Sequence, residues 1–139
     1  MTGSKAQGEE LAAEWSAFLC RYYKTTGALD RALVADHGLA VSDFEVLQQL
    51  FVAKIGSAEG RVRFHDLGAQ THLTQSALSR LVSRLVKAGL VARSTAEDDR
   101  RSMWVQITPA GEQRFLEARP THRAILAELA EGAADDSAE

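Results

Sequence analysis

The sequence predicts a mainly α-helical fold of the α+β type, in which a short β-hairpin lies between helices. Apolar residues recur at steps of three, four and seven along most of the chain, which is the spacing of helices that bury one face. Residues 90–94 and 102–107 instead have the pattern of two strands. A length of 139 residues, 45% of them hydrophobic and 25% charged, is typical of one soluble domain. We therefore expect residues 1–139 to form a single domain.

Residues 9–36 are expected to form one long helix, ended by Gly38 as a C-terminal cap. The apolar positions of this helix are Leu11, Trp15, Phe18, Leu19, Tyr22, Leu29 and Leu33. Such a helix has more apolar surface than a small domain can easily cover. The sequence therefore favours an interface with a second copy of the chain, and the alternative is a larger intramolecular core.

The next segment is predicted to begin a helix at a capping box, in which Ser42 and Glu45 satisfy each other's backbone amides. The apolar face of this helix is Phe44, Leu47, Leu50 and Phe51. Residues 56–60 are rich in glycine and predict a loop, and residues 61–64 alternate like a short strand. A short helix is expected at about residues 66–71.

The stretch 75–88 predicts a strongly amphipathic helix. Thr74 is a suitable N-cap, and Gly89 followed by Leu90 resembles a helix-ending glycine. One side of the helix carries Leu78, Leu81, Val82 and Leu85. The other side carries Gln75, Ser76, Ser79, Arg80, Ser83, Arg84 and Lys87.

Two strands, a charged loop and a last helix complete the expected fold. Residues 95–101 form the predicted hairpin tip, which carries Arg100 and Arg101. Thr108 and Pro109 should begin the last helix, because a hydroxyl cap precedes a proline at the first helical position. Its buried side is expected to be Phe115, Leu116, Ile125, Leu126 and Leu129. Pro120 should bend or break this helix, and residues 132–139 predict a disordered tail.

This order of elements predicts a winged helix-turn-helix with long terminal helices. The winged lobe should span about residues 42–108, and the dimerisation region about residues 9–38 and 109–131. Charge supports a role for the lobe: residues 61–101 hold eight Lys/Arg and four Asp/Glu, although the whole chain has a net charge of −3. A basic segment in an acidic protein predicts a phosphate-binding face. The alternative is chance clustering on a solvated surface.

The polar side of residues 75–88 has the residue types that read DNA bases. Glutamine can pair with adenine and arginine with guanine in the major groove, and base contacts concentrate near the start of a recognition helix. The hairpin loop could place an arginine in the minor groove. The alternative is an ordinary surface helix and a solvated turn neutralised by Asp98 and Asp99. The predicted DNA-binding residues are Thr74, Gln75, Ser76, Ser79, Arg80, Arg84, Lys87, Asp99, Arg100 and Arg101.

The stretch LTQSALSRLVSRLVKAGLV, followed by DRRSMWVQITPAG, resembles the MarR family of bacterial transcription regulators. The family pattern combines a recognition helix, L-x-x-S-x-x-S-R-x-x-x-x-L, with a wing, D-x-R-x-x-x-V-x-L-T-x-x-G. The wing positions fall on Asp99, Arg101, Val105, Ile107 (in place of leucine), Thr108 and Gly111. The resemblance reaches from the first helix to about Leu129.

The resemblance implies a homodimer held by the first and last helices. It implies a palindromic operator on double-stranded DNA, and repression that a small ligand or an oxidant relieves. Arg101 would be the minor-groove arginine, and Asp99 would orient it or pair with a neighbouring arginine such as Arg84. One departure is that the family has a further final helix where this chain has an Ala- and Asp-rich tail. This departure predicts either a smaller dimer interface or a short last helix.

Aromatic residues could line an effector pocket between the dimer helices and the lobe. The candidates are Trp15, Phe18, Tyr22, Phe44 and Phe115, and plain core packing is the favoured alternative for each. Cys20 could be a thiol-based oxidant sensor, but a buried structural cysteine is favoured.

Other classes of function find little support. We find no nucleophile–base set and no phosphate-cradling glycine loop, and His37, His65, His72 and His122 are scattered. We therefore expect no enzyme activity, no cofactor and no metal. A lone cysteine, with no membrane span and no secretory signal, predicts a cytoplasmic protein. The sequence thus favours a sequence-specific DNA-binding transcription regulator that acts as a repressor, and a winged-helix protein-interaction module is the alternative.

Overall fold

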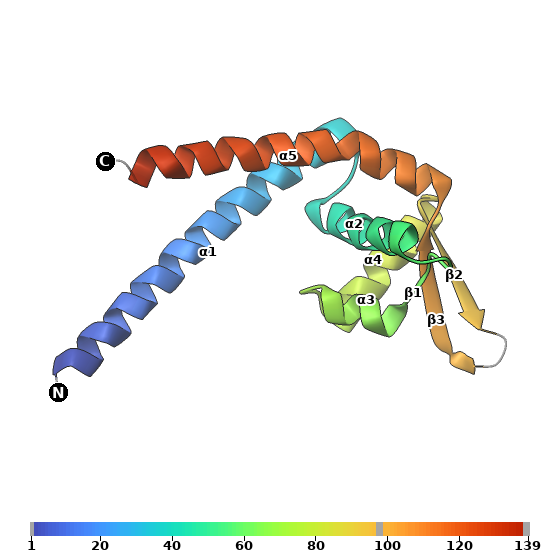
Figure 1. Ribbon diagram of the computed structural model, residues 1–139, viewed down its shortest axis with the longest axis horizontal. Coiled ribbons are helices and arrows are strands. Elements are labelled where there is room, and N and C mark those ends of the chain that lie inside the picture. Colours follow the sequence, from blue (N-terminus) through green and yellow to red (C-terminus); the bar gives the residue numbers. More distant parts are fainter. Residues whose placement is uncertain (1, 97–98, 138–139) are drawn as a thin grey trace.

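The computed structural model describes the backbone of residues 2–96 and 99–137, and the side chains of residues 3–95 and 103–132. The elements follow in the order α1 (Thr2–His37), α2 (Val41–Gly56), β1 (Val62–Arg63), α3 (Phe64–Gln70), α4 (Gln75–Lys87), β2 (Val91–Ala96), β3 (Asp99–Ile107) and α5 (Pro109–Ser137). In Figure 1, helices α2, α3 and α4 and the sheet form one lobe, from which α1 and α5 extend as two long arms. The predicted winged helix-turn-helix with long terminal helices is confirmed.

The sheet has the strand order β1-β3-β2, and both strand pairs are antiparallel. Val62 pairs with Val105, and Val91 pairs with Ile107, so these apolar side chains share the face that packs on the helices. The hairpin strands are longer than expected, because β2 continues to Ala96 and β3 begins at Asp99. The predicted seven-residue tip is therefore mostly strand, and residues 97 and 98 lie outside the described residues.

The core lies inside the lobe and at the roots of the two arms. Every residue of the predicted apolar stripe of α4 is buried, and so are Phe44, Leu47 and Leu50 of α2. Leu29 and Leu33 of α1 and Phe115 of α5 join the same cluster. The core thus ties both arms to the lobe.

Helix α1 is buried at its C-terminal end only. It ends at Gly38, whose positive φ of 67° is the left-handed conformation expected of a capping glycine. Two polar contacts then fasten this end to α5. Arg114 donates to the carbonyl oxygen of His37 (3.0 Å), and the His37 ring contacts the Thr121 hydroxyl (2.8 Å).

The predicted capping box of α2 was wrong by two residues. The N-cap is Ala40, whose amide donates to Oδ2 of Asp43 (2.9 Å), and Ser42 and Glu45 lie inside the helix. The start of the helix is fixed by distant contacts, because Asp43 is buried against Arg84 of α4 and the Val41 amide donates to Asp30 of α1 (3.0 Å). The local pattern contains neither partner.

Two expectations for α5 were also wrong. Pro120 does not break the helix, because buried Ala118 and the contact of Thr121 with α1 hold both sides of the proline in place. The helix also continues through Gly132 to Ser137, where a disordered tail was predicted. Alanine is the best helix former, and one glycine costs only about 1 kcal/mol. Residues 138 and 139 lie outside the described residues.

Within the described part of the chain, none of the helices is both long and apolar enough to cross a membrane. The same residues contain no cluster of three or more His, Cys, Asp or Glu side chains that could hold a metal ion.

Candidate nucleic-acid interface

Helix α4 is held rigidly at both ends. At its start, the Thr74 hydroxyl accepts a hydrogen bond from the Ala77 amide (3.1 Å), as predicted. At its end, Gly89 adopts φ 80°, its amide donates to Val86, and the Leu90 amide donates to Leu85 (3.0 Å each). This pair of bonds is the Schellman motif, which satisfies the last carbonyl groups of a helix. The helix therefore presents its outer face in a fixed orientation.

The outer face of α4 is entirely polar. All the residues predicted there are exposed: Gln75, Ser76, Ser79, Arg80, Arg84 and Lys87, with Thr74 just before them. The first turns of the helix border an open groove, which is closed on its other side by the start of α3 and by Met103 of β3. Hydrogen-bond donors and acceptors are thus gathered along one edge of the lobe, beside a concave surface.

Arg84 differs from the other exposed residues because its guanidinium is already engaged. Its Nη2 atom is 2.5 Å from Oδ1 of Asp43, which is 5% exposed. Arg84 therefore pairs with α2, and the side chain of Asp99, its suggested partner, lies outside the described residues. One carboxylate holds both the first turn of α2 and the last turn of α4, so it fixes how these two helices sit relative to each other.

The wing consists of β2 and β3. Asp99, Arg100 and Arg101 lie in β3 and not in a loop, and their side chains lie outside the described residues. Arg93 of β2 donates to the Ser83 hydroxyl of α4 (3.2 Å), which links the wing to the polar side of the helix.

Thr108 and Gly111 join the wing to α5 and to the end of α4. The Thr108 hydroxyl donates to the carbonyl oxygen of Gly89 (2.7 Å) and accepts from the Gly111 amide (3.0 Å). At Gly111 an added Cβ would lie 2.0 Å from the carbonyl oxygen of Leu90, so only glycine fits. The threonine and glycine of the wing pattern therefore have a structural role at a junction of three elements.

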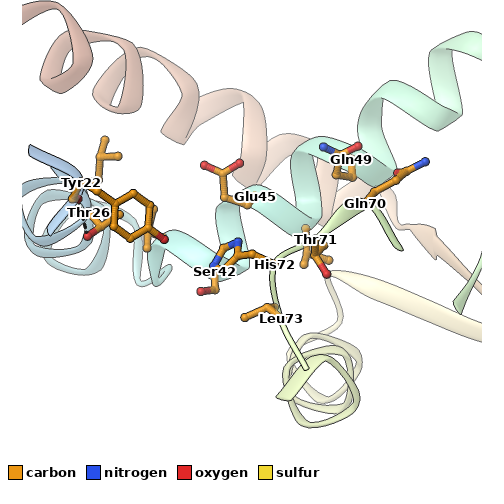
Figure 2. A pocket seen from close by; sticks show the side chains of 12 residues that line it. Tyr22, Thr26, Ser42, Glu45, Gln49, Gln70, Thr71, His72 and Leu73 are labelled. Atoms are coloured by element: carbon orange, nitrogen blue, oxygen red, sulfur yellow. Dashed lines mark hydrogen bonds between the residues drawn. The ribbon is translucent and has the colours of Figure 1, made fainter. Parts of the chain in front are cut away.

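A cavity of about 230 Å³ lies between the root of α1, the start of α2 and the connection from α3 to α4. Figure 2 shows that its labelled side chains come from all three segments. They are Tyr22, Thr26, Ser42, Glu45, Gln49, Gln70, Thr71, His72 and Leu73, and the lining also includes Leu29, Val41 and Val46. The cavity thus lies between the α1 arm and the helix-turn-helix.

Among the five aromatic residues predicted to line a pocket, only Tyr22 borders this cavity. Phe44 and Phe115 belong to the core, where their ring centroids lie 5.2 Å apart. Trp15 and Phe18 are exposed on the outer part of α1. The polar residues that do line the cavity were missed, because no periodic pattern in the sequence brings residues 70–73 beside α1.

His122 of α5 sits behind the start of α2. Its ring stacks on Phe44 with a centroid distance of 4.3 Å, and its Nε2 atom is 3.7 Å from Glu45. Burial lowers the pKa of His122 below its usual 6.5, although the Glu45 carboxylate opposes this shift. Cys20 is exposed on α1, so the expectation of a buried structural cysteine was wrong.

Comparison with known proteins agrees with this architecture. A family model described as "MarR family" matches residues 37–102, from the end of α1 into β3. Sco3205 from Streptomyces coelicolor is a MarR family transcriptional regulator whose structure was solved in complex with DNA. It superimposes with a TM-score of 0.77 at 26% identity, covering 87% of this chain and 73% of that one. Residues 37–102 of this chain belong to the MarR family.

Two curated transcription regulators match shorter stretches of this chain. The regulator FarR of Neisseria gonorrhoeae is 31% identical over 70 residues, which is 50% of this chain and 48% of FarR. The transcriptional repressor YetL of Bacillus subtilis is 26% identical over 102 residues, 73% of this chain and 59% of YetL. This chain thus spans about half the length of FarR and under two thirds of YetL.

Proposed function

We propose that this chain is a sequence-specific DNA-binding transcription regulator. The observation that supports it best is the exposed polar face of α4, backed by a fully buried apolar stripe. Sco3205, with the same fold, is described as bound to DNA. In this proposal α4 enters the major groove, where Gln75 reads adenine and Arg80 reads guanine or binds a phosphate. Ser76 and Ser79 lie on the same face and complete the contact surface.

The remaining predicted residues position the duplex. Thr74 and Lys87, at the two ends of α4, contact phosphates, and Arg84 does so with the part of its guanidinium that Asp43 leaves free. From the wing, Arg101 and Arg100 reach the minor groove, and Asp99 orients Arg101. Phosphate contacts by the two cations Arg84 and Lys87 are consistent with the net positive charge of residues 61–101.

The functional unit in this proposal is a homodimer on a palindromic operator. The winged lobe of residues 42–108 reads DNA, and the arms of residues 9–38 and 109–131 join two copies. The support is the exposed apolar surface of α1, where Leu11 is 59%, Trp15 60% and Phe18 49% exposed. Monomeric proteins rarely expose a contiguous row of large apolar side chains. Two-fold symmetry would place the two α4 helices about one turn of DNA apart or a multiple of it.

The proposed regulation is repression that a small ligand relieves, and YetL is likewise named a repressor. The cavity beside Tyr22 is the proposed ligand site. Its lining is mainly apolar, with a few hydroxyl, amide, imidazole and carboxylate groups, which favours a largely apolar molecule that carries some hydrogen-bonding groups. A ligand there would contact α1 and the connection into α4 at once, and could therefore change how the lobe sits on the arms.

The test is selection of duplexes from a random pool by the purified protein, followed by binding measurements over a range of salt concentrations. We expect a palindromic consensus and affinity that falls steeply with salt. Gln75→Ala and Arg80→Ala should change the selected sequence, whereas Lys87→Ala should weaken all sequences alike. Duplex binding that does not depend on salt would contradict the proposal. An unchanged consensus sequence in both Gln75→Ala and Arg80→Ala would also contradict it.

A further inference from the structure

The outer face of the three-stranded sheet carries a cluster that the interface above does not use. Arg63 of β1 pairs in register with Trp104 of β3, and Arg61 directly precedes β1. The Arg61 guanidinium carbon is 4.1 Å from the centroid of the Trp104 ring, and that of Arg63 is 5.0 Å away. Two guanidiniums thus stack against one indole.

Stacking leaves the hydrogen-bonding edges of both guanidiniums free. A guanidinium against an aromatic ring directs its N–H donors sideways, in the plane of its own atoms. Among the described side chains, the one ion-pair partner of this cluster is Glu59, 3.7 Å from Arg61. Arg63 is exposed. Two neighbouring cations with free donors match the bidentate geometry that phosphate oxygens accept.

Trp104 is better suited to holding cations than to simple packing. Its Nε1 atom is buried with no acceptor within the described part of the chain. An unpaired buried donor costs about 1–3 kcal/mol, so phenylalanine would satisfy the packing with less penalty. What tryptophan adds is the strongest cation–π face among the aromatic residues.

The position of the cluster identifies its ligand. Arg63 also borders the open groove that is lined by Gln75, Ser76 and Ser79, the first exposed residues of α4. A duplex lying on α4 would carry its phosphate backbone past this edge. We propose that Arg61 and Arg63, stacked on Trp104, form a phosphate-binding site that holds the DNA backbone beside the recognition helix. The inference rests on the proposed DNA-binding function and extends its contact surface to β1.

The first experiment compares Arg61→Gln/Arg63→Gln with Lys5→Gln/Lys54→Gln, which removes the same charge from exposed positions outside the dimerisation region and the DNA interface. The probe is a duplex selected by the parent protein. Loss of the site should weaken binding about tenfold and reduce the salt slope by about one to two, with an unchanged consensus sequence. The control variant should bind like the parent.

The second experiment uses Trp104 as a reporter. The chain has two tryptophans, so Trp15→Phe leaves Trp104 alone. We expect the selected duplex to shift Trp104 emission and to do so no longer when Arg61 and Arg63 are glutamine. Trp104→Phe should keep the free energy of unfolding and still weaken duplex binding. A lower free energy of unfolding with unchanged binding would mean a purely structural tryptophan and overturn the proposal.

The outcomes separate the two proposals. If the parent binds duplexes and Arg61→Gln/Arg63→Gln matches it in affinity and salt slope, the phosphate site is wrong and the recognition helix stands. If inorganic phosphate alone produces the emission shift at millimolar concentration, the site binds free anions and the assignment to the DNA backbone is overturned. If the parent shows no salt-dependent duplex binding, both proposals fail.

Discussion

Gly111 is the glycine at which the structure leaves least room for a side chain. It lies where the first turn of α5 crosses the end of α4, and the contact is with backbone, which cannot rotate away as a side chain can. The same junction is closed by the Thr108 hydroxyl, which bonds to the chain on both sides. A two-residue contact thus sets the direction in which the α5 arm leaves the lobe.

We expect Gly111→Ala to lower the free energy of unfolding by about 1–3 kcal/mol, because the new methyl group must displace the Leu90 carbonyl. Urea denaturation at fixed protein concentration measures the effect. Gly132→Ala is the matched control in the same helix, where nothing lies within 4 Å, and it should be neutral or slightly stabilising. Equal effects of the two changes would contradict the close approach.

His122 should make the protein less stable in mild acid. Its pKa is lowered in the folded state, first by burial, so the unfolded chain binds the proton at higher pH than the folded chain does. Above pH 6.5 both states are neutral and the contribution is constant. Stability is then lost as the pH falls from 6.5 through the lower folded-state pKa.

The check is the free energy of unfolding of the parent and of His122→Phe between pH 8 and pH 5. Phenylalanine keeps a ring against Phe44 but cannot bind a proton. The fall in stability below pH 6.5 should therefore be smaller in the variant. An identical pH profile in both proteins would show that His122 does not carry the dependence.

At the scale of elements, local patterns predicted the helices and failed where a distant contact decides. Thr74 and Gly89 could be assigned from the sequence because a cap and a helix end depend on neighbouring residues only. The start of α2 could not be assigned in this way, because it depends on the contact of Asp43 with Arg84, which lies 41 residues away in the sequence. Pro120 follows the same rule, since contacts with α1 override its local tendency to break a helix.

Asp43 should therefore be more important for stability than its sequence context indicates. Asp43→Ala removes both the cap on the Ala40 amide and the anchor of Arg84, and should cost about 1–3 kcal/mol. Asp36→Ala, an exposed acid near the end of α1, should change stability by less than about 0.5 kcal/mol. Chemical denaturation of both variants tests this difference, and similar values would mean that the carboxylate does not hold α2 and α4 together.

The candidate site was predicted from the sequence only where it lies on a single element. The exposed residues of α4 follow from helical periodicity, because the buried stripe fixes the opposite face. The cavity and the Arg61–Arg63–Trp104 cluster each join segments that are far apart in sequence, and no pattern encodes that pairing. The cavity lining also includes polar residues of a short connection, which periodicity does not address.

At the scale of the whole molecule, the two arms carry apolar surface that a single copy of the chain leaves exposed. In Figure 1 the first half of α1 stands clear of the rest of the chain. Along it, Trp15 stacks near Phe18 (5.7 Å between centroids) and Phe18 near Tyr22 (6.4 Å), which forms an aromatic row. On α5, Leu116 and Leu126 are 41% and 40% exposed.

We expect Trp15→Ser/Phe18→Ser to convert a dimer into a monomer at micromolar concentration, because it removes two of the largest apolar groups of that row. Val52→Ser/Ile55→Ser is the control, since these residues are exposed at 55% and 70% on α2 and do not belong to the aromatic row. Sedimentation equilibrium measures the mass of each. The unfolding temperature of the lobe should be the same in the monomer as in the parent. The monomer should lose most of its affinity for a duplex with two half-sites, because only a dimer binds both half-sites at once. A variant that is still a dimer would contradict the role of the aromatic row. A parent that sediments as a monomer would contradict it as well, and each lobe would then have to bind DNA alone.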